Sequence, residues 1–155
     1  MSQTISGFLS DHLSASKAIG ALNKEWLTYG ALRELTQKVN TPLRDSGISK
    51  KDRVAIVLPH GAAMASAFIT IAQAATTAPL NPNYREDEFA FYLEDLTAKA
   101  IVLEAGYAGP AEAAARRREQ DAEREAARLA AAAQRTEARR WRREQTENAL
   151  RAQRQ

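Results

Sequence analysis

Residues 53–58 of this 155-residue chain read Arg-Val-Ala-Ile-Val-Leu, and Pro59, His60 and Gly61 end the run. The apolar side chains follow one another without polar alternation, and the run is rich in β-branched residues. A short run of this kind is typical of a strand that is covered on both faces, as in a parallel sheet. We therefore predict a buried strand here.

The segments that follow alternate between helix and strand patterns. Apolar spacing predicts helices near residues 62–74 and 86–96, and short apolar runs predict strands near 76–80 and 100–103. Such alternation is typical of right-handed crossover units. The predicted fold class is therefore α/β, a partial three-layer unit with a small parallel sheet and crossover helices, followed by a long C-terminal helix. The side chains that we expect to be buried are Val54, Ile56, Leu58, Phe68, Ile71, Leu93 and Ile101.

The segment before the sheet predicts a hairpin and a helix. Residues 17–29 hold two short apolar runs around a polar Asn-Lys-Glu turn, which is typical of a hairpin. Thr28 can cap the next helix, near residues 30–46, because its hydroxyl can accept a hydrogen bond from a first-turn N–H group. Pro42 lacks an N–H group and disfavours helix in the residue before it, so we expect a break or kink there.

Composition and charge change near residue 110. Residues 1–109 hold ten Lys or Arg against eleven Asp or Glu, whereas residues 110–155 hold twelve Arg against eight acidic residues. The second segment is rich in helix-forming Ala, Glu and Gln, which predicts a long exposed helix with few contacts to the sheet. We expect a partial N-terminal domain at 1–109 and an Arg/Ala/Glu-rich helical tail at 110–155. Its uniform Arg usage and abundant Ala would also fit GC-rich DNA read in an unintended frame or through an unspliced intron.

Three motifs in the front segment carry a family resemblance. They are Trp-Leu-Thr-Tyr-Gly-Ala-Leu at 26–32, Gly-Ile-Ser-Lys-Lys-Asp-Arg-Val-Ala-Ile at 47–56 and Ala-Pro-Leu-Asn-Pro-Asn-Tyr at 78–84, continuing as Arg-Glu-Asp-Glu-Phe-Ala-Phe-Tyr-Leu to 93. About residues 17–117 resemble the N-terminal part of the adenylate-forming, AMP-binding acyl-CoA synthetase superfamily, most closely its oxalate–CoA ligase branch. His60 departs from the family pattern, which usually has Asn after Leu-Pro. The sequence after Arg117 departs from the pattern altogether.

The resemblance implies a reaction in which a carboxylate and ATP form an acyl adenylate, from which CoA then displaces AMP. It implies ATP, Mg²⁺ and CoA for the full-length family, a Ser/Thr/Gly-rich loop ending in Pro-Lys, an acidic residue for the ribose and a Lys on a mobile C-terminal domain. None of these motifs occurs in the sequence, and neither does a phosphate-binding glycine motif. We therefore expect a truncated, catalytically incompetent protein with no catalytic, cofactor-binding or metal-binding residues and no cofactor of its own.

Other candidate groups have simpler explanations than catalysis. His60 is expected in a turn, because no carboxylate or nucleophile is spaced to work with it, and His12 is expected at the surface. The acidic residues 86–88 lie where the first turn of a helix favours negative charge. Asp52 is expected to be a loop residue that precedes a strand. Cysteine is absent and the two histidines are far apart in sequence, so no metal site is predicted.

Two further functions stay open, and both involve the tail. Its arginines could bind nucleic acid, but acidic residues dilute them and only Trp141 could stack on a base, so nucleic acid is the less favoured partner. The densest basic cluster comprises Arg135, Arg139, Arg140, Arg142 and Arg143. The second function is self-association through a thin apolar seam. This seam comprises Ala122, Ala126, Leu129 and Ala133.

The sequence also limits the expected location. The first residues show no basic segment followed by an apolar one, and the least polar stretch, residues 61–80, is interrupted by polar side chains. We therefore expect no membrane partner and favour an intracellular location, which is cytoplasmic or, as for some relatives, peroxisomal.

Overall fold

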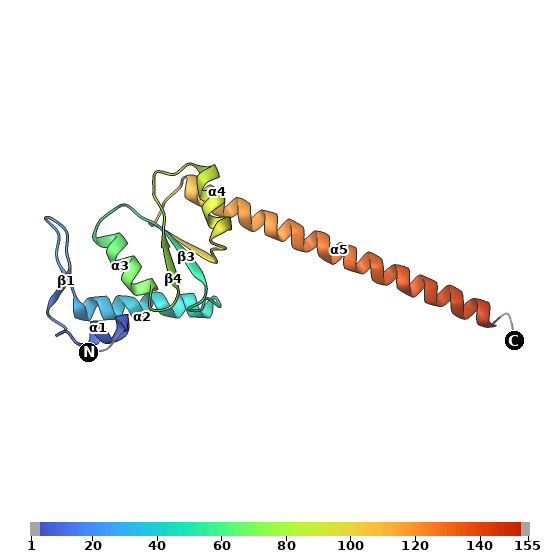
Figure 1. Cartoon of the computed structure of the whole chain (residues 1–155), viewed down its shortest axis with the longest axis horizontal. Helices are drawn as coiled ribbons and strands as arrows, with labels where there is room; N and C mark the ends of the chain where they lie inside the picture. The colour runs from blue at the N-terminus through green and yellow to red at the C-terminus, as the bar shows by residue number, and fades with distance from the viewer. Residues whose placement is uncertain (1–3, 153–155) are drawn as a thin grey trace. The chain divides into compact units, whose positions relative to one another are not determined.

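The computed structural model describes residues 4–152, with side chains up to residue 146. The chain forms two compact units, residues 1–115 and 116–155. The elements, labelled in Figure 1, are α1 (Ile5–Ser10), β1 (Lys17–Ile19), β2 (Leu27–Thr28), α2 (Tyr29–Asp45), β3 (Arg53–Val57), α3 (Ala62–Ile71), β4 (Thr76–Pro79), α4 (Glu86–Asp95), β5 (Ala100–Leu103) and α5 (Pro110–Ala152).

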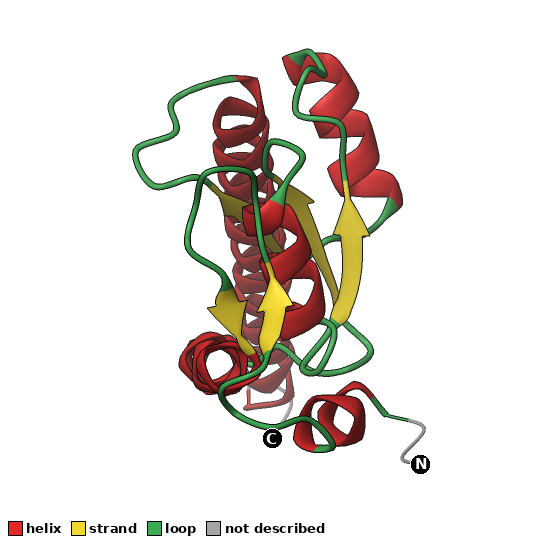
Figure 2. Ribbon diagram, turned by 90° about the vertical axis from the view of Figure 1, so that its left-hand side faces the viewer, coloured by secondary structure: helices red, strands yellow, loops and turns green. Residues whose placement is uncertain are grey.

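The first unit is built around a three-stranded parallel sheet. Its strand order is β4-β3-β5, and β3 pairs in parallel with both neighbours. Ala55 of the central strand lies opposite Ala78 on one side and Ile101 on the other. The prediction of three parallel strands joined by crossover helices is confirmed (Figure 2).

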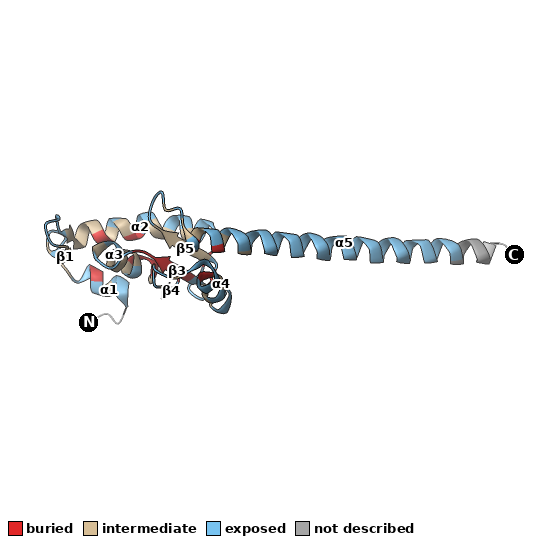
Figure 3. Ribbon diagram, turned by 90° about the horizontal axis from the view of Figure 1, so that it is seen from above, coloured by how far each residue is buried: buried red, intermediate tan, exposed pale blue. Residues whose placement is uncertain are grey.

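Successive residues of β3 point into two different cores, because side chains alternate between the faces of a strand. Val54 and Ile56 pack with Ile71 of α3 in a cluster that α2 also covers. Ala55 and Val57 pack in the other cluster, which α4 and the first turns of α5 cover. The sheet therefore has helices on both faces, which explains the unbroken apolar run of β3 (Figure 3).

Helix α2 continues through Pro42, so the break that was one of the two outcomes expected there does not occur. Pro42 has no N–H group to donate to the helix, but its carbonyl accepts a hydrogen bond from the Ser46 N–H at 3.0 Å. The helix ends at Asp45, close to the predicted end near residue 46, and Gly47 follows with a φ of +74°. The Gly47 N–H donates to the Arg44 carbonyl at 2.9 Å and the Ile48 N–H to the Leu43 carbonyl at 3.0 Å. This pair of hydrogen bonds is the Schellman motif, which favours glycine.

Two of the predicted core residues are less buried than expected. Phe68 is 42% exposed, so its predicted burial is wrong. Helix α3 instead turns Thr70 and Ile71 inward, and Thr70 can be buried because its hydroxyl donates to the Ser66 carbonyl at 2.8 Å. Ile101 is only partly buried because β5 is an edge strand. The other predicted core residues are buried, namely Val54, Ile56, Leu58, Ile71 and Leu93.

The N-terminal segment holds the predicted hairpin and one helix that was not predicted. Strands β1 and β2 pair antiparallel, and the Thr28 hydroxyl accepts a hydrogen bond from the Ala31 N–H at 3.2 Å, so both predictions are confirmed. The unpredicted helix is α1, whose C-terminal end is held by Arg33. The Arg33 guanidinium donates to the Leu9 carbonyl at 2.6 Å and the His12 carbonyl at 3.3 Å.

The predicted long C-terminal helix is confirmed as α5, which has 43 residues. Its residues 119–146 are all exposed (Figure 3). Its first turns differ from the expectation of few contacts, because Ala111 and Ala114 are buried in the core of the first unit. Within residues 4–152, no helix is long and apolar enough to cross a bilayer.

Substitution of Ile56 by Ala should lower the free energy of unfolding of the first unit by about 2–5 kcal/mol, since it leaves a cavity in the core. The matched control is Leu22→Ala, because Leu22 is 90% exposed, and its effect should stay within about 0.5 kcal/mol. Urea unfolding followed by Trp26 fluorescence in a Trp141→Phe background measures the first unit alone. Equal effects of the two substitutions would contradict this assignment of the core.

Candidate functional site

The sheet topology defines one candidate crevice at the carboxyl ends of the strands. The chain leaves β3 through α3 on one face, and it leaves β5 toward the start of α5 on the other face. Ligands of open α/β sheets bind at the point where the strand order reverses, which in the order β4-β3-β5 lies between β3 and β5. The crevice between β3 and β5 is therefore the topological candidate for a binding site.

Few chemically active groups line this edge. His60 lies exposed in the turn after β3, as predicted, and Glu104 lies exposed after β5. Gly61 precedes α3 with a φ of +143° and gives that helix no side-chain cap. After β4, the Asn81 side chain accepts a hydrogen bond from the Asn83 N–H at 3.0 Å and so shapes its own turn. The described side chains at this edge therefore include several that shape turns.

Tyr84 follows the same turn and belongs to an aromatic group with α4. Its ring stacks on that of Tyr92, with 5.0 Å between the ring centroids. A hydrogen bond to Tyr92 raises the pKa of Tyr84 above its ordinary value of 10.0. Tyr84 therefore connects the turn after β4 to helix α4.

The acidic residues at the start of α4 serve the helix end. The Glu88 carboxylate accepts a hydrogen bond from the Arg85 N–H at 2.8 Å, which caps α4, and residues 86 and 87 are exposed in its first turn. Among the described residues, no group of three or more His, Asp or Glu side chains could hold a metal ion. These residues therefore do not fit the Mg²⁺ that the family reaction implies.

Asp52 lies at the opposite, amino-terminal end of the sheet and is more constrained than a simple loop residue. Its carboxylate lies 2.9 Å from the Lys99 ammonium and accepts hydrogen bonds from the Ser49 N–H at 2.8 Å and the Ser49 hydroxyl at 2.7 Å. The hydrogen bond from Lys99 has the largest effect. Together with the hydrogen bonds from Ser49, it lowers the pKa of the Asp52 carboxyl from 3.8 to about 2. The Asp52–Lys99 pair ties the start of β3 to the start of β5, so its role is structural.

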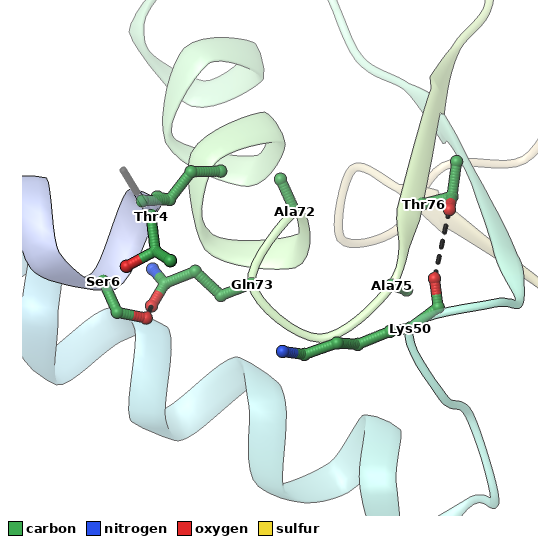
Figure 4. A pocket seen from close by; sticks show the side chains of 8 residues that line it. Thr4, Ser6, Lys50, Ala72, Gln73, Ala75 and Thr76 are labelled. Atoms are coloured by element: carbon green, nitrogen blue, oxygen red, sulfur yellow. Dashed lines mark hydrogen bonds between the residues drawn. The ribbon is translucent and has the colours of Figure 1, made fainter. Parts of the chain in front are cut away.

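A cavity of about 300 Å³ also lies at this amino-terminal end (Figure 4). The residues that line it are Thr4, Ile5, Ser6, Lys50, Ala72, Gln73, Ala75 and Thr76. Gln73 accepts a hydrogen bond from the Ser6 hydroxyl at 2.8 Å and donates one to Thr36 at 3.2 Å. Gln73 therefore joins α1 to α2 across the end of α3. Among these lining residues, Lys50 is the single charged one.

His12, which was expected at the surface, is half-buried. Its ring stacks on Tyr29, with 4.1 Å between centroids, and meets Phe8 edge-on at 4.9 Å. These contacts hold the chain after α1 against the start of α2. His12 and Tyr29 are 17 positions apart in the sequence, so no sequence pattern could have indicated this contact.

The sequence matches the family described as AMP-binding enzyme over residues 12–154. Over 114 residues it is 34% identical to the oxalate–CoA ligase of Saccharomyces cerevisiae, covering 66% of this chain and 21% of that protein. Over 119 residues it is 33% identical to the oxalate–CoA ligase of Arabidopsis thaliana, covering 74% of this chain and 23% of that protein. The chain thus spans about a fifth of the length of these relatives.

Solved structures share the fold. The N-terminal subdomain of Klebsiella oxytoca NpsA superposes with a TM-score of 0.57 at 20% identity, over 68% of this chain and 28% of that one. Apo MatB from Rhodopseudomonas palustris superposes with a TM-score of 0.56 at 22% identity, over 63% of this chain and 20% of that one. The fold and the motifs define an α/β segment of the adenylate-forming type. The chain belongs to the AMP-binding enzyme family, and the predicted resemblance is confirmed.

Substitution of Asp52 by Asn should destabilise the first unit at neutral pH. Because the folded-state pKa is depressed, the carboxylate stabilises the fold above its ordinary pKa of 3.8, and this contribution is lost as pH falls through about 2. The difference in urea midpoint between the parent and Asp52→Asn should therefore be constant from pH 7 to pH 5. It should decrease toward zero as the pH approaches 2. Glu34→Gln, at an exposed helical site, should show no such closure. A gap that widens on acidification would contradict the depressed pKa.

Proposed function

We propose that residues 1–115 form the N-terminal α/β part of an AMP-forming acid–CoA ligase. The full reaction of such an enzyme converts a carboxylate, ATP and CoA to acyl-CoA, AMP and pyrophosphate. The observation that carries the proposal is the parallel sheet β4-β3-β5 within a chain of the AMP-binding enzyme family. In this proposal the segment supplies a scaffold, and a longer polypeptide supplies the groups that perform the adenylation.

The outer edge of β5 supports the scaffold role. The Lys99 N–H donates to the Arg53 carbonyl at 2.9 Å, so the backbone groups of Lys99 point toward β3. Because backbone N–H and C=O groups point to alternate sides along a strand, those of Ala100 and Val102 point away from β3. Both side chains are apolar and only partly buried. A further strand at this edge would pair with these backbone groups and cover these side chains.

The outer edge of β4 is less suited to a further strand. The Thr76 N–H donates to the Asp52 carbonyl and the Leu80 N–H donates to the Ile56 carbonyl, at 2.9 Å each. Because backbone groups point to alternate sides along a strand, those of Thr77 and Pro79 point away from β3. Pro79 has no N–H group to donate, and proline is characteristic of edge strands. We therefore assign the continuation of the sheet to the β5 side.

The segment lacks the groups that adenylation needs. Charge builds on the phosphoryl group in the transition state, and preorganised donors or cations must already stand where it develops. The sequence has no Ser/Thr/Gly-rich loop ending in Pro-Lys and no phosphate-binding glycine motif. Oxalate is the first carboxylate to test, because two relatives are oxalate–CoA ligases by name.

The purified chain alone should not exchange pyrophosphate into ATP above a no-protein control, with oxalate or other carboxylates, because the loss of even one preorganised donor costs on the order of 10²–10³ in rate. Exchange clearly above that control would contradict the absence of an adenylation site.

A chimera tests the scaffold role directly. Residues 12–115 replace the matching segment of the Saccharomyces cerevisiae enzyme, and the chimera should retain oxalate-dependent pyrophosphate exchange. The same chimera with Ile56→Asp is the control and should lose both cooperative unfolding and exchange, since it buries an unpaired charge. A chimera that unfolds cooperatively yet exchanges no pyrophosphate would overturn the scaffold proposal.

A further inference from the structure

Between residues 135 and 144, the charged residues of α5 lie on different sides of the helix. A helix turns about 100° per residue, so Arg135, Arg139, Arg142 and Arg143 fall within about 100° of one another. We call these four residues the basic face. Glu137 and Glu144 project from the opposite side of the helix, about 150° or more from the centre of the basic face. All six residues are exposed.

The carboxylates described up to residue 146 do not neutralise the charge of the basic face. Ion pairs nearer the start of α5 join Arg124 to Asp121 at 3.4 Å and Arg128 to Glu125 at 3.8 Å. Up to residue 146, where side chains are described, no ion pair joins an arginine of the basic face to a carboxylate. Between residues 135 and 146 the acidic residues are Glu137 and Glu144, and both lie on the side of the helix away from the basic face.

The spacing of the basic face suits a densely charged polyanion. The face extends from residue 135 to residue 143, which is about 12 Å of helix axis and close to the Debye length of about 10 Å at 0.1 M salt. The four guanidinium groups therefore act together on a partner. Double-stranded DNA carries one negative charge per roughly 1.7 Å of its axis, and the planar guanidinium group forms paired hydrogen bonds with phosphate oxygens.

We propose that the basic face binds the phosphate backbone of double-stranded nucleic acid without reading the bases. The position of Trp141 favours a duplex over an unpaired strand. This side chain lies about 150° from the centre of the basic face, so it cannot stack on a base while the basic face contacts the backbone. The proposal concerns α5 alone and does not depend on the function proposed for the first unit.

Fluorescence anisotropy with the full chain and a labelled DNA duplex of mixed sequence tests the proposal. The expected dissociation constant is on the order of 10⁻⁴–10⁻⁶ M at physiological salt, as for non-specific binding. The slope of log affinity against log salt should be about −3 to −4, since each phosphate contact contributes roughly −0.9.

The variant Arg135→Gln/Arg139→Gln/Arg142→Gln should lose at least about tenfold in affinity and reduce the salt slope by roughly 2 to 3. Glutamine keeps a high helix propensity, and circular dichroism checks that the helix persists. The matched control, Lys38→Gln/Lys50→Gln/Lys51→Gln, removes the same charge from exposed sites of the first unit and should change affinity by less than about twofold. The triple Arg→Lys variant should retain most of the binding, because it keeps the charge.

Several results would overturn the proposal. These are equal losses in the Arg→Gln and Lys→Gln triple variants, a salt slope near zero, and tighter binding of unpaired DNA than of the duplex. Equal binding of polyglutamate at matched charge would overturn nucleic acid as the partner and would indicate an acidic protein instead.

Discussion

Strand β3 is hydrogen-bonded along both edges and packed on both faces, and the rest of the first unit is arranged around it. Val54, Ala55, Ile56 and Val57 are each at most 2% exposed. Each helix of the crossover units covers one face of β3, and each neighbouring strand completes one of its edges. A strand enclosed on four sides accepts only apolar side chains, so this single constraint determines which residues can stand at 54–57.

The same constraint explains why so much of the fold could be predicted from the sequence. An unbroken apolar run flanked by turn residues is a strong local signal, and the predicted strand near residues 100–103 coincides with β5. The errors occur where distant residues decide the outcome. Helix α1 has only six residues and depends on Arg33, and the burial of Phe68 depends on which face of α3 meets α2 and the sheet. Ala111 and Ala114 have the composition of the exposed tail, and only their contacts distinguish them.

The family could also be predicted from local sequence, whereas the contacts of the candidate residues could not. The three motifs predicted the family because they are contiguous in sequence, and they map onto the start of α2, the turn before β3 and the turn after β4. The pairing of Asp52 with Lys99 joins residues 47 positions apart and could not be predicted from spacing. The motifs therefore mark the local geometry of the sheet ends, and contacts between distant residues hold the scaffold of the fold together.

The parallel order β4-β3-β5 supports both the family fold and the proposed continuation of the sheet at β5. Its most direct test is the pattern of inter-strand nuclear Overhauser effects in the isotope-labelled chain. The structure predicts backbone contacts from the Ala55 region to both Ala78 and Ile101, with the Hα-to-amide pattern of parallel strands. Strong Hα-to-Hα contacts between β3 and either neighbour would show antiparallel pairing and would contradict the parallel sheet.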